Sequence, residues 1–544
     1  MSPLRTAPDG PVLVFDVAIV GFGPTGAVAA ALLGQAGLTV HVCDLREDVH
    51  DRPRAVSLDH EILRVLDGIG VLAQVEPWME PFTDSEYVGV DGRLIKCMTT
   101  TAPPYPLAYP PSVVFSQPPV ERALRDRVAA LADVEIDLGS EVVGVDQDDE
   151  AVTLHLRRAD GGAGDGTMMK TVVARHVIAC DGASSRVRGL VGIALDDLGF
   201  DEPWLVIDVL ANARGLARLP AVSMQYCEPE RPCSYIIGPK NHRRWEISLK
   251  DGEDPAQMAT EAGAWRALAR WITPDDGTLW RQASYRFHAL VAQRWRAGRV
   301  FVAGDAAHQQ PPFLGQGLCQ GLRDVANLCW KLVAVHEGRA APSLLDSYGA
   351  ERKRHVEQLT ARIKGVGAVI CERDPERARA RDAALLAACG GVVRAEPRQS
   401  VQPRLESALL PPVIDDVDHR PSAIGTLFPQ PWIVQDNGRA RLDRLTGTCW
   451  RIVTDDAAMA AAVPPAAAQR LRSRTVEIGP GATALHETEG VVADWFDRHR
   501  CRAAIVRPDH YIHAVATTPD ELAQQLRDLS ARLAAPTPTP TGAS

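Results

Sequence analysis

The sequence has no surplus of basic residues, no hydrophobic run of membrane-spanning length and no CxxC motif. Its 544 residues carry a formal net charge of −10, which argues against nucleic acid or an anionic membrane as a partner. The 11 cysteines occur singly, a pattern typical of reduced thiols in a cytosolic protein. No stretch approaches the roughly 20 apolar residues of a membrane-spanning helix. We therefore expect a cytoplasmic protein without a metal site and without nucleic-acid or membrane partners.

A dinucleotide-binding fingerprint lies near the start of the chain. The apolar residues 14–20 are typical of a buried strand, and the glycine-rich residues 21–26 (GFGPTG) follow directly. A helix is expected over 27–33, and a second strand over 39–43 then leads to Asp44. Glycines allow a tight turn, the helix N-terminus attracts a pyrophosphate, and an acidic residue accepts from a ribose hydroxyl. The context predicts a complete dinucleotide-binding βαβ unit.

Two further strands end in a carboxylate. Residues 175–180 form an apolar run that ends in Asp181-Gly182, and residues 299–303 form another that ends in Gly304-Asp305. The second continues through a Pro-rich and Gly-rich turn into a helical pattern. Open α/β sheets bind ligands at the carboxyl ends of their strands. One Asp-Gly after a strand is usually only a turn, but the three motifs in this order predict a shared binding site.

Together the three motifs resemble those of the FAD-dependent aromatic hydroxylases of the para-hydroxybenzoate hydroxylase class. They are most similar to the 3-(3-hydroxyphenyl)propionate/3-hydroxycinnamate hydroxylases, over most of residues 14–375 and most specifically over residues 304–332. The resemblance implies an α/β fold with a Rossmann-like FAD-binding domain and an inserted antiparallel-sheet substrate domain. A C-terminal thioredoxin-like domain is implied by residues 447–453 and 506–512. It lacks CxxC, so we expect a packing or dimer-contact role rather than redox activity.

The expected domain boundaries follow from this resemblance. They are 14–80, 112–198 and 286–375 for the FAD-binding domain, 81–111 and 199–285 for the substrate-binding sheet, 376–431 for a helical or loop connector, 432–533 for the thioredoxin-like domain, and 534–544 for a disordered tail.

The resemblance also implies how FAD is held. Gly21, Gly23 and Gly26 face the pyrophosphate, Asp44 the adenosine ribose and Asp305 the ribityl chain. The helix after residues 315–321 points its N–H groups at the flavin N1/C2=O edge. Para-hydroxybenzoate hydroxylase has Asn where Cys319 stands here, so a backbone contact is expected at that position. The full set of expected FAD contacts is Gly21, Gly23, Pro24, Thr25, Gly26, Asp44, Leu45, Arg46, Arg54, Gln117, Asp181, Gly182, Gly304, Asp305, Ala306, Pro311, Gly315, Gln316, Gly317, Leu318 and Cys319.

The sequence contains no second dinucleotide fingerprint. The family resembled here binds NADH or NADPH transiently, after which reduced flavin and O2 form a C4a-hydroperoxide that hydroxylates a phenol. The cofactor performs the oxygen chemistry, so no acid–base triad is expected. His308 and Pro312 are the flavin-adjacent candidates for a catalytic role, although a packed histidine is the more ordinary interpretation of His308.

Substrate contacts are expected from the strand-rich middle of the chain. The candidates are Tyr226, Tyr235 and Trp245 for the ring, each of which alone is more typical of sheet packing. A carboxylate on the substrate calls for an arginine. Arg231, Arg243, Arg244 and Arg286 all qualify, and the sequence does not rank them.

The sequence thus predicts an FAD monooxygenase that uses NAD(P)H and O2 to hydroxylate a phenolic acid ortho to its hydroxyl, such as a 3-(3-hydroxyphenyl)propionate-like compound. Alternatives are the same chemistry on a polycyclic, heteroaromatic or antibiotic phenol, a halogenase or reductase, and a non-catalytic flavin-binding module. The Trp-x-Trp-x-Ile-Pro signature of related halogenases is absent. The sequence leaves the choice between NADH and NADPH, and between monomer and homodimer, open.

Overall fold

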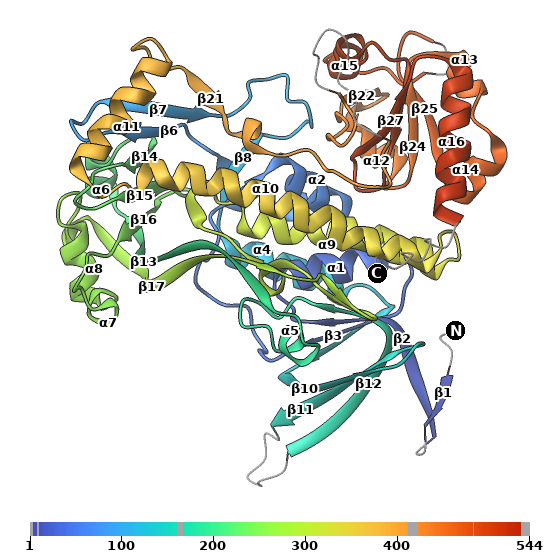
Figure 1. The fold of residues 1–544 in the computed structure, drawn as a ribbon, viewed down its shortest axis with the longest axis horizontal. Helices are drawn as coiled ribbons and strands as arrows, with labels where there is room; N and C mark the ends of the chain where they lie inside the picture. Colours follow the sequence, from blue (N-terminus) through green and yellow to red (C-terminus); the bar gives the residue numbers. More distant parts are fainter. Residues whose placement is uncertain (1–3, 8–9, 160–166, 412–421, 482–483, 535–544) are drawn as a thin grey trace, which may run out of the picture.

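The computed structural model describes residues 4–7, 10–159, 167–411, 422–481 and 484–534. In this part of the chain, two large sheets and a smaller C-terminal sheet are arranged around the long helices α9 (Gly317–His336) and α10 (Asp346–Ile370) (Figure 1). The tail predicted for 534–544 lies, except for Ala534, outside the described residues. None of the described helices combines the length and the hydropathy needed to cross a membrane.

The first sheet is the nucleotide-binding sheet expected from the fingerprint. Its central strands pair in parallel because each βα unit returns the chain to the same edge. The order is β10 (Ser140–Gln147), β11 (Val152–Ala159), β12 (Thr167–Ala179), β2 (Gly10–Val20), β3 (Val40–Asp44) and β9 (Val134–Leu138), with β1 (Leu4–Ala7) on β2, β19 (Val300–Val302) on β12 and β18 (Arg296–Ala297) on β19.

Helix α1 (Pro24–Gln35) is buried almost all round between this sheet, α4 (Gln117–Ala129) and α9. Four of its twelve residues are alanine and two are glycine, which lets neighbouring backbones come close. At Gly34 an added Cβ would lie 2.7 Å from the Val134 side chain. Small elements that join the two large sheets are β4 (Ser57–Asp59), α2 (His60–Gly68), α3 (Leu72–Val75), β5 (Met79–Pro81), β8 (Ser112–Phe115) and α5 (Arg186–Leu190).

The second sheet is mainly antiparallel and comes from the middle of the chain. Its order is β20 (His308–Gln309), β17 (Gly277–Ala292), β13 (Leu195–Ala211), β16 (His242–Ser248), β15 (Cys233–Ile237), β14 (Ser223–Tyr226), β6 (Ser85–Val88), β7 (Leu94–Thr99) and β21 (Ala395–Pro397). The helices α6 (Ala213–Arg218), α7 (Pro255–Met258), α8 (Glu261–Leu268) and α11 (Pro375–Ala388) surround it (Figure 1).

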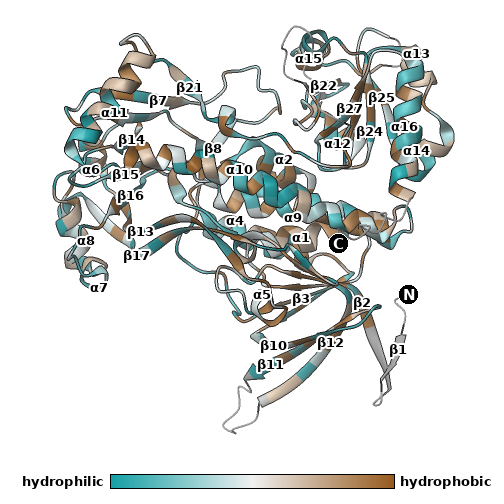
Figure 2. Cartoon of the chain, in the orientation of Figure 1, coloured by the Kyte–Doolittle hydropathy of each residue, from teal (hydrophilic) through white to brown (hydrophobic). Residues whose placement is uncertain are grey.

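The C-terminal sheet has the order β25 (Arg474–Glu477), β24 (Arg451–Thr454), β26 (Ala503–Val506), β27 (Ile512–Ala516), with β24 and β25 parallel and the other pairs antiparallel. Strands β24 and β27 are largely apolar, and the outer helix α16 (Pro519–Ala534) is largely polar (Figure 2). The remaining elements are β22 (Trp432–Gln435), β23 (Gly438–Arg441), α12 (Leu442–Thr446), α13 (Ala457–Ala461), α14 (Pro465–Leu471) and α15 (Val491–His499).

Buried ion pairs join the C-terminal region to the helices of the first sheet. Arg64 Nε donates to Asp443 at 2.5 Å, and Arg507 Nη2 lies 2.8 Å from Glu351 Oε2. Burial opposes ionisation of Glu351, but Arg507 and Lys331 hold the pKa of its carboxyl well below its usual range. Losing one partner would leave an unpaired buried charge, so these contacts fix the C-terminal region in place.

Candidate flavin and substrate site

The three carboxylate-bearing loops begin at the carboxyl ends of neighbouring parallel strands of the first sheet. Strands β2, β12 and β19 are neighbours in parallel register, with Ala179 opposite both Val20 and Val302. Cys180 N donates to Val20 O at 2.7 Å, and Ala303 N donates to Ala179 O at 2.9 Å. The carboxyl ends of the strands therefore bring motifs from distant parts of the sequence together, at the place where open α/β sheets bind their ligands.

The first loop has three glycines with different tasks. Gly21 has φ +100°, and an added Cβ would lie 2.4 Å from Cys180 O. At Gly26 an added Cβ would lie 1.9 Å from Gly21 O, so the helix must approach the turn closely. At Gly23 an added Cβ meets nothing within 4 Å. Gly23 thus faces open space at the N-terminus of α1, where a pyrophosphate is stabilised by backbone N–H groups.

Asp44 closes this loop. Its carboxylate accepts from Phe22 N at 2.6 Å and from Arg46 N at 2.7 Å, which fixes it at the end of β3. The side chain of Leu45 is 64% exposed. Arg125, which the sequence analysis missed, donates to Phe22 O at 3.2 Å from α4 and supports the same turn.

Asp305 provides the test of fit for a flavin nucleotide. Its side chain is accessible to solvent, yet desolvation by the surrounding protein raises the pKa of its carboxyl. Within the described ranges, we find no hydrogen bond or ion pair to this carboxylate. A carboxylate that is recessed, reachable and unpaired suits a ribityl hydroxyl. Together with the open space at Gly23, this arrangement fits FAD.

The third loop and the first meet at Thr25. An added Cβ at Gly304, which has φ +61°, would lie 2.8 Å from Thr25 Oγ1, and one at Gly321 would lie 2.6 Å from the same atom. The N-termini of α1 and α9 are therefore held against each other. Gly317 at the start of α9 faces open space, whereas the buried Cys319 thiol lies 3.9 Å from Ser57 O. A contact at Cys319 is therefore limited to its backbone.

Several expected FAD contacts use their side chains inside the protein. Asp181 accepts from Val187 N at 3.0 Å and so holds the start of α5. The side-chain amide oxygen of Gln117 accepts from Arg54 N at 3.1 Å and from Ala55 N at 2.7 Å. These residues shape the segments around the site, and a role in touching the cofactor with their side chains stays a prediction.

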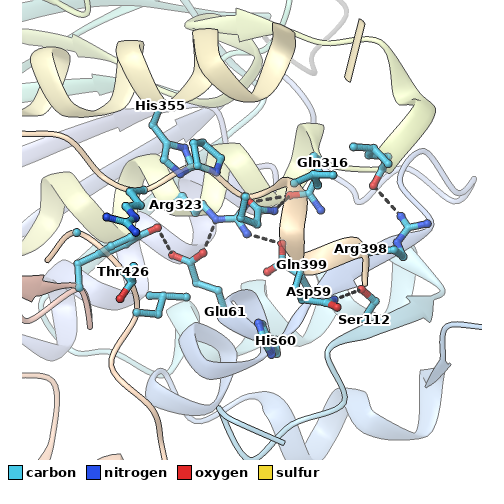
Figure 3. Close-up of a pocket in the computed structure, with 18 residues that line it drawn as sticks. Asp59, His60, Glu61, Ser112, Gln316, Arg323, His355, Arg398, Gln399 and Thr426 are labelled. Atoms are coloured by element: carbon cyan, nitrogen blue, oxygen red, sulfur yellow. Dashed lines mark hydrogen bonds and ion pairs between the residues drawn. The ribbon is translucent and has the colours of Figure 1, made fainter. Parts of the chain in front are cut away.

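The Gln316 side chain turns into a separate cavity of about 230 Å³ beneath the third loop (Figure 3). Its amide oxygen accepts from Arg323 Nη1 at 3.0 Å and from Gln402 Nε2 at 2.9 Å. Arg323 also pairs with Asp59 at the end of β4 and with Glu61 on α2 (Figure 3). This cavity lies between the third loop, α2 and the connector.

His308, which follows β19, is buried and packed in the structure. The ring is 1% exposed, stacks on Trp295 and lies with Nε2 2.8 Å from Asp324 Oδ2. Asp324 also accepts from Gly304 N at 2.9 Å and from Arg352 Nε at 2.9 Å. This placement favours the packed-histidine interpretation over a catalytic one, because the imidazole acts on the Gly304 turn through Asp324. Pro312 opens the turn Pro312–Leu314, which is part of the third loop between β19 and α9.

The aromatic candidates for substrate contact lie on the wrong face of the second sheet. Tyr235 and Trp245 meet with ring centroids 5.1 Å apart and belong to the core that covers α7 and α8. Tyr226 accepts from Trp271 Nε1 at 3.2 Å in the same core. Period-two alternation puts all three on one side of the sheet, and that side is closed by Leu268 and its neighbours. The structure therefore assigns them to packing.

The opposite face of the second sheet carries buried charges. Arg244 Nε donates to Asp208 Oδ1 at 2.7 Å, and Arg244 Nη1 donates to Arg54 O at 2.7 Å. Arg281 on β17 donates to Pro53 O. Burial opposes ionisation of Asp208, but Arg244 and His242 lower the pKa of its carboxyl to about 2. This face therefore joins the second sheet to the Pro53–Arg54 segment beside the first loop.

The arginines suggested for a substrate carboxylate already have partners. Arg231 pairs with Glu253 at 2.5 Å, and Arg286 pairs with Asp201 at 3.0 Å near the exposed edge. Arg243 donates to His242 O at 2.7 Å and to Lys240 O at 3.0 Å in the turn before β16. The sequence carried a signal for the polar face: in residues 242–248, alternation places Arg244 and Glu246 opposite Trp245.

Comparisons with known proteins agree with this geometry. Residues 14–363 match the model of the FAD binding domain family, and residues 425–532 match the HcaD C-terminal domain. The chain is 34% identical to a probable NADH-specific resorcinol 4-hydroxylase of Rhodococcus jostii, with 98% of each chain covered. It is 32% identical to a 3-(3-hydroxy-phenyl)propionate/3-hydroxycinnamic acid hydroxylase of Burkholderia vietnamiensis, covering 92% of this chain and 93% of the relative.

Solved structures show the same fold. The flavin-dependent monooxygenase PieE, in complex with FAD and substrate, superposes with a TM-score of 0.80 at 23% identity, covering 97% of this chain and 100% of that one. Aklavinone-11 hydroxylase, with FAD and aklavinone, gives a TM-score of 0.76 at 22% identity, covering 95% of this chain and 98% of that one. The family match over most of the chain, carried by the loops described above, shows that this chain belongs to the FAD binding domain family as a flavin-dependent aromatic hydroxylase.

Proposed function

We propose that the chain is a single-component monooxygenase that uses NADH and O2 to hydroxylate a phenol ortho to its hydroxyl. The overall balance is phenol, O2, NADH and a proton giving an ortho-diol, NAD⁺ and water. When bound, FAD supplies the redox and oxygen chemistry. The observation that carries the proposal is the recessed, unpaired Asp305 at the point where the three loops meet. NADH is preferred because the R. jostii relative is named as NADH-specific.

The chain's own residues bind and orient the reactants. Gly23 and the N-terminus of α1 receive the pyrophosphate, Asp44 the ribose and Asp305 the ribityl chain. The second sheet covers the site and excludes water, which protects reactive intermediates from wasteful hydrolysis. His308 holds the Gly304 turn through Asp324. No side chain is assigned to proton transfer in this scheme.

The finer substrate assignment has support on two sides. A 3-(3-hydroxyphenyl)propionate-like acid is supported by the name of the B. vietnamiensis relative, and a carboxyl-free phenol by that of the R. jostii relative. The carboxylate partners of Arg231, Arg244 and Arg286 weigh against an anionic substrate, whereas Arg243 donates to the backbone carbonyls of Lys240 and His242.

The C-terminal region acts as a scaffold that packs against the flavin-binding part of the chain. Its strand order, with one parallel pair and two antiparallel pairs, supports the thioredoxin-like assignment. It has no CxxC motif. Its buried ion pairs with α2 and α10 support packing against the flavin-binding part of the chain.

Flavin content and coupled turnover test the proposal. The purified protein should be yellow and should consume NADH and O2 in step with a hydroxylated product. Asp305→Ala should weaken FAD binding by about 1.5–3 kcal/mol, or roughly 10- to 100-fold, because a charged acceptor is lost. Asp91→Ala, which removes an exposed carboxylate paired with Arg93, is the matched control. Protein that stays colourless after incubation with FAD would contradict the proposal.

A further inference from the structure

Glu246 is a buried carboxylate with an incomplete set of partners. The residue is 4% exposed, and its nearest cation is Arg244, with Nη1 3.9 Å from Glu246 Oε1. Across the described ranges we find no hydrogen bond to its carboxylate. Burial raises the pKa of this carboxyl despite the nearby Arg244. The carboxylate keeps a small solvent contact, so the hydrogen bonds that it lacks within the protein are open to water or to a ligand donor that displaces this water.

The position of Glu246 along β16 places it between the loops that frame the flavin site. Alternate residues on one face of a strand are about 7 Å apart. On one side, Arg244 reaches the backbone of Pro53 and Arg54. The positive charge of Arg54 also acts on the Asp305 carboxyl, opposing the rise of its pKa. This end of the face therefore lies beside the expected ribityl site.

On the other side, Ser248 is paired across the sheet with Trp204 on β13. The Trp204 ring meets Phe313 with centroids 5.7 Å apart, and Phe313 belongs to the turn Pro312–Leu314 in the third loop. Glu246 lies between these two anchor points and faces the same way.

The cross-strand neighbours of Glu246 on this face are uncharged. Val206 and Ser234 are its cross-strand partners, and Ala283 lies beyond Val206. The Ser234 hydroxyl donates to Gln225 Oε1 at 2.5 Å and is already engaged. Of the residues that flank Glu246 on this face, Arg244 carries a charge, whereas Val206, Ser234 and Ala283 do not.

The two guanidinium groups next to Glu246 already have hydrogen-bond partners, so neither is free to bind an anion. Arg244 donates to Asp208 and to the carbonyls of Pro53 and Arg54. Arg281 donates to Pro53 O and to the Tyr285 hydroxyl. Asp208 and Glu246 match the charges of Arg244 and Arg281, and Arg373, farther along this face, donates to Ser248 Oγ at 2.5 Å and to Leu249 O at 2.8 Å. A substrate carboxylate here would add a third buried negative charge next to Glu246, and like charges at this distance repel strongly.

We propose that Glu246 accepts a hydrogen bond from a second hydroxyl of a neutral, single-ring diphenol and excludes phenolic acids. This inference rests on the proposed function and narrows its substrate class. Glu246 acts as a specificity determinant by two means: it rewards a donor, and it penalises a negative charge. The reacting ring position is set by the flavin and lies outside this contact.

Three probes separate the two effects in the holoprotein at pH 8. Resorcinol is neutral with a second donor, 3-methoxyphenol is neutral without one, and 3-(3-hydroxyphenyl)propionate is anionic. In the wild type, kcat/KM for resorcinol should exceed that for 3-methoxyphenol by about 10- to 100-fold, with the acid weakest. Binding of each probe to the oxidised holoprotein, followed by flavin absorbance, should give the same order.

Two variants and a control locate the effect. Glu246→Leu should equalise resorcinol and 3-methoxyphenol, because the acceptor is lost. Glu246→Gln keeps the shape and an acceptor but removes the charge, so the acid should gain about 10-fold or more relative to resorcinol. Glu228→Gln, which removes a partly exposed carboxylate paired with Arg270 at 2.8 Å, should leave all ratios unchanged.

The outcomes distinguish this inference from the proposed function. If the wild type prefers the acid, or the Glu246 variants leave the ratios unchanged, the inference is overturned while the hydroxylase assignment stands. If the three probes bind in the expected order without forming product, the inference stands and the proposed function fails. If the flavin-loaded protein binds none of the three probes, the inference is overturned.

Discussion

The two faces of the second sheet are made by the same strands, yet their chemistry is opposite. On one face Tyr235, Trp245 and their neighbours form an apolar core against α7 and α8. On the other face Asp208, Arg244 and Glu246 are buried and charged. A β-strand can serve both because successive side chains point to opposite sides. The apolar face holds the sheet together, whereas the polar face joins it to the flavin-binding loops and carries the proposed substrate contact.

The largest effect should come from the apolar face. Trp245→Ala removes a fully buried ring and should lower the free energy of unfolding by about 3–5 kcal/mol. Denaturant titration of the holoprotein measures this loss. The ratio of kcat/KM values between phenols should stay at the wild-type value, and a changed ratio would mean that Trp245 touches the substrate. Trp78→Ala, at a partly exposed ring on the surface, provides the control.

A smaller loss of stability with a functional component is expected on the polar face. Arg244→Leu leaves Asp208 without its main partner and should cost about 3 kcal/mol. It should also weaken FAD binding, because Arg244 holds the carbonyls of Pro53 and Arg54. In the double variant with Asp208→Asn the stability cost should shrink, since the stranded charge is gone. Fully additive losses would contradict the pairing.

The polar face should also carry a pH signature that the apolar face lacks. The pKa of Asp208 is lowered to about 2 from a usual value of 3.8. A carboxyl with a depressed folded pKa stabilises the protein above its unfolded pKa, and this stabilisation is lost as pH falls from about 4 to about 2. Asp208→Asn should remove about 2 kcal/mol of this dependence. Unfolding curves of the two proteins between pH 5 and pH 2 test it, and identical slopes would refute it.

The smallest effect concerns a single hydroxyl on the apolar face. Tyr235→Phe removes the hydrogen bond from the Tyr235 hydroxyl to Pro220 O, which spans 3.3 Å, and should cost about 1 kcal/mol. Substrate preference should again be unaffected. A drop in turnover without a drop in stability would restore Tyr235 as a ligand contact.

Local motifs made the flavin-binding half of the molecule predictable. The strand, glycine turn and helix expected within residues 14–33 form as β2 and α1. The carboxylates Asp44 and Asp305 lie at strand ends that meet. These features depend on neighbours in the chain, so a short window of sequence contains them.

Side-chain contacts between residues far apart in the sequence could not be predicted from the sequence. Gln117 and Asp181 were expected to touch the cofactor, but their side chains are held by Arg54, Ala55 and Val187. The Asp324 link from His308 to Gly304 depends on the packing of α9 against the third loop. The residues next to them in the sequence give no indication of these partners.

The sequence by itself determined that a dinucleotide binds at the ends of parallel strands, because glycine spacing and strand–helix alternation are local properties. It also determined that residues 242–248 alternate between two kinds of side chain. Only the tertiary structure decided which set faces the flavin loops. Alternation says that Trp245 and Glu246 point in opposite directions, but the direction of the site is set by where α7, α8 and the first sheet pack. Large aromatic residues therefore line the core, and Glu246, the proposed substrate contact, lies on the opposite face.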